Sequence, residues 1–397
     1  MVNRKKRIGI DARFYGPLGK GLGRYTQEVV DNIINIDKDN EYVIFLGANN
    51  FDEFAIAPEN IRRVKKVKID IRWYTLKEQF LFPYYIRREH LDLIHFPHFN
   101  VPIFIFSKFV VTVHDLILTK FPTVRATTLS PAIYRLKNLA YRLVIWLALK
   151  RAQKIITVSE FTKNDIIEQF HIHQEKIIVT YEGVANLAKG NDTLFVKKMD
   201  EDSALSRYQI KDNFLLYIGN AYPHKNLEGL VQVFSRVFKK HPELRLVLVG
   251  KSDYFYERVK AYAASLKLYQ KDENTSPIIF PGYVSDAELE ILFKKALFYI
   301  FPSLYEGFGL PPLEAMAKGC PVLSSNKSSM PEILGEAAFY FNPESKDQME
   351  SAIEKMITDE NLRADLIKKG FNQSKKYNWW ECAYATYKVY NSVLYGN

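Results

Sequence analysis

The chain has 397 residues, too many for one common hydrophobic core, and this length predicts two domains of roughly 150 to 200 residues each. Hydrophobic residues make up 47% and charged residues 25%, as in folded globular proteins, and no apolar run approaches the ~20 residues of a membrane-spanning helix. The net charge of +10 favours an anionic partner, either a phosphorylated small molecule or an anionic membrane surface; no nucleic-acid-binding module is evident, so nucleic acid is not expected.

The start of the chain favours a cytoplasmic protein. The basic residues 4–7 lead directly into a predicted strand, without the apolar stretch of a signal peptide. Cys320 and Cys382 lie far apart in the sequence and indicate neither a disulfide framework nor a metal cluster, which fits a reducing compartment. We therefore expect a cytoplasmic protein, with peripheral attachment to the inner face of the plasma membrane as an open alternative.

Strands and helices alternate through the first half of the chain. Short apolar runs predict strands at residues 7–12, 42–47, 93–98, 109–114, 154–159 and 176–181. Helical periodicity predicts helices at residues 22–36, 131–150 and 160–170. This alternation implies a parallel sheet wrapped by helices.

A glycine-rich segment, residues 16–25, follows the first strand and opens the first helix. It does not fit the G-x-G-x-x-G pattern, so it does not predict a dinucleotide site. Its glycines, among them Gly23, would let the backbone approach a phosphate or a sugar closely. The alternative is a surface turn.

His114 ends the fourth predicted strand, where its ring can donate a hydrogen bond to a sugar hydroxyl or meet a developing charge. The alternative is a core histidine satisfied by the backbone. His95 and His98 would complete a three-histidine set with His114, but no carboxylate or cysteine spacing supports zinc, and we expect no metal site.

The predicted helix at residues 131–151 is apolar and basic, without an acidic residue. This composition suits a helix at a membrane surface, whereas the same apolar spacing also suits a helix packed on its own domain. Its basic residues are Arg135, Lys137, Arg142, Lys150 and Arg151.

Residues 185–212 are polar and break the alternation, which then restarts. We place an N-terminal domain at residues 1–190, a linker at 191–212, a second domain at 213–377 and a final helix within 378–397. Strands are predicted at residues 214–219, 245–250, 278–284, 297–302, 321–325 and 337–342, and helices at 227–240, 254–265 and 286–296. Ser285 and Glu288 form a capping box for the last of these helices.

Lys225 follows the first strand of the second domain and precedes the next helix, for which Asn226 is the expected N-cap. A cation at a helix N-terminus opposes the helix dipole, so a bound anion would explain it. The alternative is a solvated surface lysine.

The run from Ser303 to Ala317 is the most informative segment. Glu306 and Glu314 stand eight residues apart, and between them lie a glycine loop and a helix start marked by Pro311 and Pro312. Backbone N–H groups from 307 to 310 and the helix dipole suit anionic oxygens, and each carboxylate can accept two hydrogen bonds from a vicinal diol. This chemistry fits a nucleotide sugar; the alternative is an ordinary strand–loop–helix connection.

This segment resembles the E-x7-E motif of the family 4 retaining glycosyltransferases, which have the two-domain GT-B fold, and the resemblance extends from Arg7 to about Tyr390. Residues 217–226 resemble the phosphate-gripping loop of that family, and residues 16–25 resemble its glycine loop. The resemblance implies an α/β fold of two doubly wound Rossmann-like domains facing across a cleft, with the C-terminal helix crossing back to the first domain.

The resemblance also implies residue roles. Glu314 would bind the nucleotide ribose, Glu306 the hydroxyls of the donor sugar and Lys225 the diphosphate. Many members carry arginine where Asn220 stands, so a second cationic clamp is not implied. Val284, with its neighbour Tyr283, is a candidate contact of the base. The predicted donor-binding residues are Gly23, Lys225, Val284, Glu306, Gly307, Phe308, Gly309, Leu310 and Glu314, and the predicted catalytic residues are His114, Lys225 and Glu306.

We expect a retaining enzyme that moves a hexose from a nucleotide diphosphate sugar to a hydroxyl of a glycan or lipid-linked acceptor in cell-surface polysaccharide synthesis. The donor is a co-substrate, and no cofactor or metal is expected. GDP-mannose is the favoured donor because two segments look like those of bacterial mannosyltransferases, with UDP-glucose next. The alternatives are a nucleotide-sugar epimerase or phosphorylase on the same scaffold, and a catalytically silent sugar-nucleotide-binding or membrane-recruitment protein.

Overall fold

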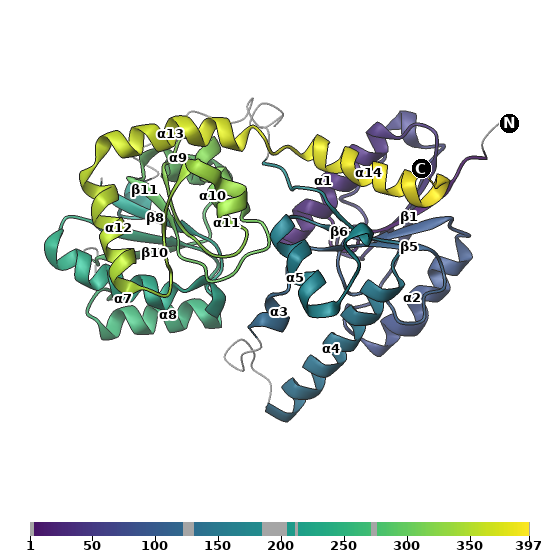
Figure 1. Cartoon of the computed structure of the whole chain (residues 1–397), viewed down its shortest axis with the longest axis horizontal. Coiled ribbons are helices and arrows are strands. Elements are labelled where there is room, and N and C mark those ends of the chain that lie inside the picture. The colour runs from purple at the N-terminus through teal and green to yellow at the C-terminus, as the bar shows by residue number, and fades with distance from the viewer. Residues whose placement is uncertain (1–3, 122–130, 185–204, 211–212, 271–275, 397) are drawn as a thin grey trace. The chain divides into compact units, whose positions relative to one another are not determined.

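The structure, a computed structural model, describes residues 4–121, 131–184, 205–210, 213–270 and 276–396 (Figure 1). The chain divides into two compact units: unit 1 comprises Met1–Gly183 and Asn378–Asn397, and unit 2 comprises Val184–Tyr377. Of the predicted linker, residues 191–204 and 211–212 lie outside the described residues.

Unit 1 is built on a seven-stranded parallel sheet with the order β3-β2-β1-β4-β5-β6-β7. Its strands are β1 (Arg7–Asp11), β2 (Glu41–Leu46), β3 (Val64–Lys68), β4 (Leu93–Phe96), β5 (Phe109–Val113), β6 (Lys154–Thr157) and β7 (Ile177–Val179). Sequence patterns predict all of these except β3. That strand carries three lysines and lies at the sheet edge, where charged side chains discourage pairing with another chain.

Two groups of helices cover the two faces of this sheet. The helices of unit 1 are α1 (Lys20–Ile36), α2 (Leu76–Arg88), α3 (Ile117–Lys120), α4 (Pro131–Arg151), α5 (Glu160–Phe170) and α14 (Trp379–Tyr395). Phe82 of α2, Ile145 of α4 and Ile166 of α5 share one hydrophobic cluster with strand residues such as Phe45 and Val111. Helices α1 and α14 pack side by side on the other face (Figure 1).

The C-terminal helix α14 belongs to unit 1, although unit 2 precedes it in the chain. The Tyr390 hydroxyl lies 2.6 Å from Nδ1 of His95 in β4. Gly183 lies so close to the start of this helix that a Cβ there would sit 2.2 Å from the backbone nitrogen of Trp379. The end of the chain is therefore part of the core of the first unit.

Unit 2 contains a six-stranded parallel sheet with the order β10-β9-β8-β11-β12-β13. Its strands are β8 (Phe214–Ile218), β9 (Arg245–Val249), β10 (Ile278–Gly282), β11 (Phe298–Phe301), β12 (Val322–Ser325) and β13 (Ala338–Phe341), all predicted from the sequence. Its helices are α7 (Leu227–Lys240), α8 (Tyr254–Ser265), α9 (Asp286–Lys295), α10 (Leu310–Ala317), α11 (Met330–Leu334), α12 (Lys346–Thr358) and α13 (Glu360–Ser374). The capping box of Ser285 and Glu288 at the start of α9 is confirmed.

The strand order reverses between β1 and β4 in unit 1 and between β8 and β11 in unit 2. In doubly wound sheets, ligands bind outside the carboxyl ends of the strands at such a reversal, because the two following connections leave toward opposite faces and open a crevice. In unit 2 this point lies between the segment carrying Lys225, after β8, and the segment carrying Glu306, after β11.

Candidate functional site

The loop after β8 is held by buried tyrosine hydroxyls. Tyr217 donates a hydrogen bond of 2.7 Å to the Asn220 carbonyl, Tyr299 donates one of 3.1 Å to the Ile218 carbonyl, and Tyr256 donates one of 2.8 Å to the Gly219 carbonyl. Burial raises the pKa values of Tyr217 and Tyr299 well above 10, so both hydroxyls stay protonated and can donate. Sequence patterns indicate only core aromatics at these positions, since the hydroxyl partners depend on the tertiary structure.

Lys225 ends a short 3-10 helix, Pro223–Lys225, directly before α7. Asn226 occupies the N-cap position of α7, but in a left-handed conformation and without a side-chain capping bond. Its amide instead donates to the Pro343 carbonyl at 3.0 Å. The predicted N-cap position is confirmed, whereas the predicted capping by the side chain is wrong because this more distant acceptor binds the amide.

Lys225 and Glu306 meet in the structure. The Lys225 ammonium lies 2.5 Å from Oε1 of Glu306, and the two side chains are only 12% and 10% exposed. The ammonium also lies 5.4 Å from the centre of the Phe301 ring. A hydrogen bond of 2.7 Å from Leu304 N–H to the His224 carbonyl joins the two loops beside this pair. The two predicted site residues after β8 and β11 therefore form one shielded ion pair.

His224, next to Lys225, is buried, and sequence analysis does not single it out. Its pKa is lowered to about 4, chiefly by burial; the charge of Glu306 opposes this shift and the charge of Lys225 adds to it. The imidazole is therefore neutral at physiological pH. It can accept or donate a hydrogen bond near the ion pair without adding charge.

Serines after β12 hold the glycine loop that follows β11. Glu306 N–H donates to Oγ of Ser328 at 2.9 Å, and the Ser329 hydroxyl lies 3.1 Å from the Glu306 carbonyl and 3.2 Å from the Phe308 carbonyl. Gly309 has a φ of 100°, and a Cβ there would lie 2.4 Å from Cε of Met330. The serine-rich run directly before α11 is the sequence signal that could have indicated this support.

Helix α10 begins at Leu310, with Pro311 and Pro312 in its first turn as predicted. Gly319 follows the helix with a φ of 76°, as is common for a glycine directly after a helix end. Glu314 is half-buried on the second turn, and Phe308 in the preceding loop is buried. One strand–loop–helix unit therefore carries Glu306, Gly307, Phe308, Gly309, Leu310 and Glu314, and the start of α10 directly follows the glycine loop. A helix start is a favourable place for an anion.

Val284 and Tyr283 follow β10, which β9 separates from β8. Val284 is buried, whereas the Tyr283 side chain is 82% exposed. The backbone at 284 and the ring of Tyr283 are therefore what this segment presents to a ligand. Both residues follow β10, an edge strand of the sheet, whereas Lys225 and Glu306 follow the central strands β8 and β11.

Gly23 lies in the second turn of α1 in unit 1, where the preceding loop folds back on the helix. A Cβ at Gly23 would lie 2.1 Å from the Gly16 carbonyl oxygen and 2.7 Å from that of Phe14. Close packing of the loop therefore requires a glycine here, whatever ligand the loop receives.

His114, directly after β5, contacts two acceptors of unit 1. Its Nδ1 lies 2.9 Å from Oε1 of Glu182 and its Nε2 lies 3.0 Å from the Pro97 carbonyl oxygen. Burial lowers the pKa of His114, but the hydrogen bond and the charge of Glu182, with the Pro97 carbonyl and Asp115, together outweigh this effect, and the net shift is upward. Both ring nitrogens can donate at once only in the imidazolium form, so this site favours a positive charge. Sequence analysis does not identify Glu182, which lies 68 residues further along the chain.

The other two histidines considered as zinc ligands are His95 and His98. In His95, Nε2 lies 2.8 Å from the Thr112 hydroxyl and Nδ1 lies 2.6 Å from that of Tyr390. Burial lowers the pKa of His95 and of His98 to about 3. Among the described residues, no group of three or more His, Cys, Asp or Glu side chains is arranged to hold a metal ion.

One face of helix α4 packs on its own unit, which is one of the two alternatives that its sequence leaves open, and other side chains of the helix are exposed. Ile145, Ala148 and Leu149 are buried in the core of unit 1, while Leu143 and Trp146 are exposed. The side chains of residues 131–137 lie outside the described part. Across the described residues, no helix is both long and apolar enough to cross a bilayer.

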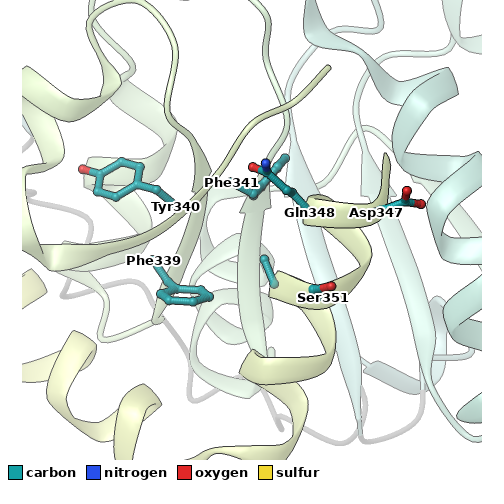
Figure 2. A pocket seen from close by; sticks show the side chains of 7 residues that line it. Phe339, Tyr340, Phe341, Asp347, Gln348 and Ser351 are labelled. Carbon is teal, nitrogen blue, oxygen red and sulfur yellow. The ribbon is translucent and has the colours of Figure 1, made fainter. Parts of the chain in front are cut away.

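A pocket of unit 2 lies beside β13, lined by Phe339, Tyr340 and Phe341 and by Asp347, Gln348, Ser351 and Ala352 of α12 (Figure 2). None of the predicted site residues lines it. We therefore locate the candidate site at the strand ends rather than in this pocket.

Comparisons with known proteins cover both units. Residues 19–185 match the family described as Glycosyltransferase Family 4, and residues 199–373 match Glycosyl transferases group 1. O-antigen chain mannosyltransferase B of Escherichia coli is 27% identical over 382 residues, which cover 93% of this chain and 95% of that protein. O-antigen chain mannosyltransferase RfbU of Salmonella typhimurium is 30% identical over 251 residues, 62% of this chain and 64% of that protein. The crystal structure of a glycosyltransferase from Rickettsia africae superposes with a TM-score of 0.71 at 18% identity, covering 99% of this chain and 100% of that one.

Proposed function

This chain belongs to the family 4 glycosyltransferases of GT-B fold and resembles bacterial mannosyltransferases, and from that premise we propose that it transfers mannose from GDP-mannose with retention of anomeric configuration. The acceptor is a hydroxyl of a glycan or lipid-linked saccharide. The observation that carries this proposal is the contact between Lys225 and Glu306 at the strand-order reversal of unit 2, with Glu314 on the helix that follows.

The proposed donor site combines one cation with two carboxylates that can accept hydrogen bonds from diols. Lys225 and the N–H groups at the start of α10 bind the diphosphate, because an ammonium and a helix N-terminus both favour anionic oxygens. Glu314 accepts hydrogen bonds from the ribose hydroxyls, and Glu306 accepts them from the sugar. In the structure Glu306 pairs with Lys225, and in the proposed complex the diphosphate takes over part of that charge compensation.

Rate acceleration in this proposal comes from fixed electrostatics. Negative charge develops on the leaving diphosphate as the glycosidic bond breaks, and donors held in place beforehand stabilise it without reorganisation. The departing phosphate accepts the proton of the acceptor hydroxyl on the same face of the sugar, which gives retention. Glu306 orients the sugar and is not an obligatory nucleophile, and no metal ion is required. The role of His114 toward the donor sugar stays a prediction.

The proposed setting is the synthesis of cell-surface polysaccharide. It is supported by the similarity to two O-antigen chain mannosyltransferases, one of which aligns over nearly its whole length. The proposed location is the cytoplasmic face of the plasma membrane, where nucleotide sugars and lipid-linked acceptors meet.

A thermal-shift panel of GDP-, UDP-, TDP- and ADP-sugars tests the donor. Binding stabilises the folded protein by an amount that rises with the logarithm of ligand concentration over Kd, so the true donor gives the largest shift at equal concentration. We expect that donor to be GDP-mannose; a larger shift with UDP-glucose would replace it. Product analysis with and without a saccharide acceptor separates transfer from epimerisation or phosphorolysis, since only transfer needs the acceptor.

A further inference from the structure

Unit 1 exposes large apolar side chains on one side of α2. Leu76, Phe80 and Tyr84 are 81%, 61% and 56% exposed. Their spacing of four residues sets them in one stripe along the helix, whereas Phe82 and Ile86 point into the core. The helix thus has one apolar face that packs on its own sheet and a second apolar face that is exposed.

The loop at residues 102–106 extends this stripe. Phe104 stacks on Phe80 with ring centres 4.9 Å apart, and Phe106 is 92% exposed. The Ile103 N–H donates to Oε1 of Gln79 at 2.7 Å, which attaches the loop to α2. The α2–loop surface consists of Leu76, Phe80, Leu81, Tyr84, Phe104 and Phe106, all of them exposed.

The loop is also attached to α4. The Arg151 guanidinium donates to the carbonyl oxygens of Ile103 and Ile105. On α4, Leu139, Leu143 and Trp146 are exposed at spacings of four and three, in line with the exposed Lys150. Because α2 and α4 pack on the same face of the sheet, their outward stripes belong to the same side of unit 1.

The charge around this surface has one sign. Within residues 72–88, 102–108 and 138–151, Glu78 is the sole carboxylate, and it is fully buried, where it pairs with Arg13. Exposed cations border the apolar stripe: Arg72, Lys77, Arg87, Arg88, Lys108, Arg142 and Lys150.

We propose that the α2–loop surface, continued by the outer stripe of α4, is a docking site for an anionic lipid bilayer, with Phe80, Phe104 and Phe106 entering the headgroup–acyl boundary. Apolar rings on segments whose exposed charges are all cations match a surface that is negative outside and apolar beneath. A surface for another protein would carry a polar rim of both signs, with lysine depleted. This docking concerns unit 1 alone and does not depend on which nucleotide sugar unit 2 binds.

Flotation of the full chain with vesicles of phosphatidylcholine containing about one-third phosphatidylglycerol tests the proposal, because that lipid supplies a net negative surface. We expect co-flotation at low salt that weakens strongly at ~0.5 M salt, where the Debye length is short. Phosphatidylcholine vesicles alone should bind far less. Absence of the chain from the phosphatidylglycerol fraction at low salt would overturn the proposal.

Paired variants locate the surface. Phe80→Ser with Phe106→Ser should weaken vesicle binding about tenfold or more, since two rings no longer enter the bilayer. Arg87→Gln with Arg88→Gln should weaken binding and flatten its salt dependence. The matched control is Tyr254→Ser, which removes an exposed ring of unit 2 and should leave vesicle binding unchanged. Unfolding temperature and the donor-induced thermal shift of each variant show that folding and the site of unit 2 persist.

Two outcomes would assign the surface otherwise. Unchanged vesicle binding by the Phe80 and Phe106 double variant, with a loss in Leu143→Ser with Trp146→Ser, would restrict docking to α4 and overturn the role of α2. Light scattering that finds a dimer of the natural chain and a monomer of the Phe80 and Phe106 variant would mean that a second copy covers the surface. Quenching of tryptophan fluorescence by brominated phosphatidylglycerol that disappears in Trp146→Phe would support bilayer contact by α4.

Discussion

Because Glu306 pairs with Lys225, mutation of Glu306 and mutation of Glu314 should have different consequences. Glu306 neutralises a shielded ammonium in the free protein, whereas Glu314 is on the following helix and is half-buried. Removing one partner of a shielded pair leaves the other charge uncompensated. The two carboxylates therefore have different surroundings, and removing each should have a different effect.

We expect Glu314→Ala to weaken donor binding and Glu306→Ala to lower turnover more than binding. A carboxylate that holds ribose contributes to ground state and transition state alike, whereas one that orients the reacting sugar acts mainly on kcat. Loss of a charged hydrogen bond costs about 2 kcal/mol, or roughly thirtyfold. Thermal shift with GDP-mannose and steady-state kinetics measure the two effects.

The matched control is Glu360→Ala, which removes an exposed carboxylate at the start of α13. Donor affinity and turnover should not change in it. Unchanged donor affinity and unchanged turnover in both the Glu306 and the Glu314 variant would refute the site assignment.

The contact between His114 and Glu182 predicts a pH dependence of stability. Since the folded-state pKa of His114 is raised, its contribution to stability is fully present below the ordinary histidine pKa of about 6.5 and is lost as pH rises through the folded-state value. Glu182→Gln removes the anion, so burial then dominates and lowers the pKa. Histidine NMR titration and the free energy of unfolding at about pH 6 and pH 8 measure this change.

Glu175→Gln, an exposed carboxylate of the same unit, is the control and should leave the His114 titration in place. If the pKa of His114 in Glu182→Gln equals that in the unmodified protein, Glu182 does not set the protonation of His114.

At the scale of elements, the strand–loop–helix unit from β11 to α10 is the part of the site that the sequence predicts most completely. A buried strand, a glycine loop, two prolines and a closing Gly319 are local signals, and each corresponds to the observed geometry. The supports of this unit are not local. Ser328 and Ser329 come from the loop after β12. The neighbouring loop after β8 is likewise held from a distance, since Tyr299 of β11 donates to the Ile218 carbonyl.

The same distinction explains what the sequence could not predict in the rest of the fold. Helix α7 has the predicted bounds because its apolar period is strong, whereas the edge strand β3 reads as a charged segment. The partner of His114 depends on which strands lie next to each other, and no local pattern encodes that order. Contacts between distant segments are therefore the part of the site that only the structure reveals.

The conformation of the glycine loop gives an element-level prediction. Gly309→Ala forces an alanine to a φ of 100° with its Cβ 2.4 Å from Met330, so we expect a loss of about 1–2 kcal/mol from the backbone strain and a further loss from displacement of Met330. The loop that precedes α10 should shift, and the donor-induced thermal shift should fall. Thermal unfolding with and without GDP-mannose measures both.

Gly282→Ala is the matched control, because Gly282 also has a positive φ, of 78°, but a Cβ there would meet nothing within 4 Å. It should show the strain alone. Equal donor-induced shifts in the two variants would mean that the loop at Gly309 does not shape the donor site.

At the scale of the whole molecule, the chain forms its first unit from both of its ends. Residues Asn378–Asn397 belong to unit 1, and α14 buries Trp379, Cys382, Ala383, Thr386, Val389 and Tyr390 there. Unit 2 is continuous from Val184 to Tyr377 and has its own sheet. Stability of the two units should therefore respond differently to changes at the C-terminus.

Deleting residues 378–397 should destabilise unit 1 by on the order of 5 kcal/mol or more, because several large apolar side chains no longer cover its sheet and His95 loses its Tyr390 partner. Hydrogen exchange should then show lost protection in β1, β4 and α1, with protection retained in β8, β11 and α7. Deleting only residues 396–397 is the control and should leave all six elements protected. Equal loss of protection in both units after the long deletion would mean that they unfold as one cooperative body, and the independence inferred from their separate cores would be wrong.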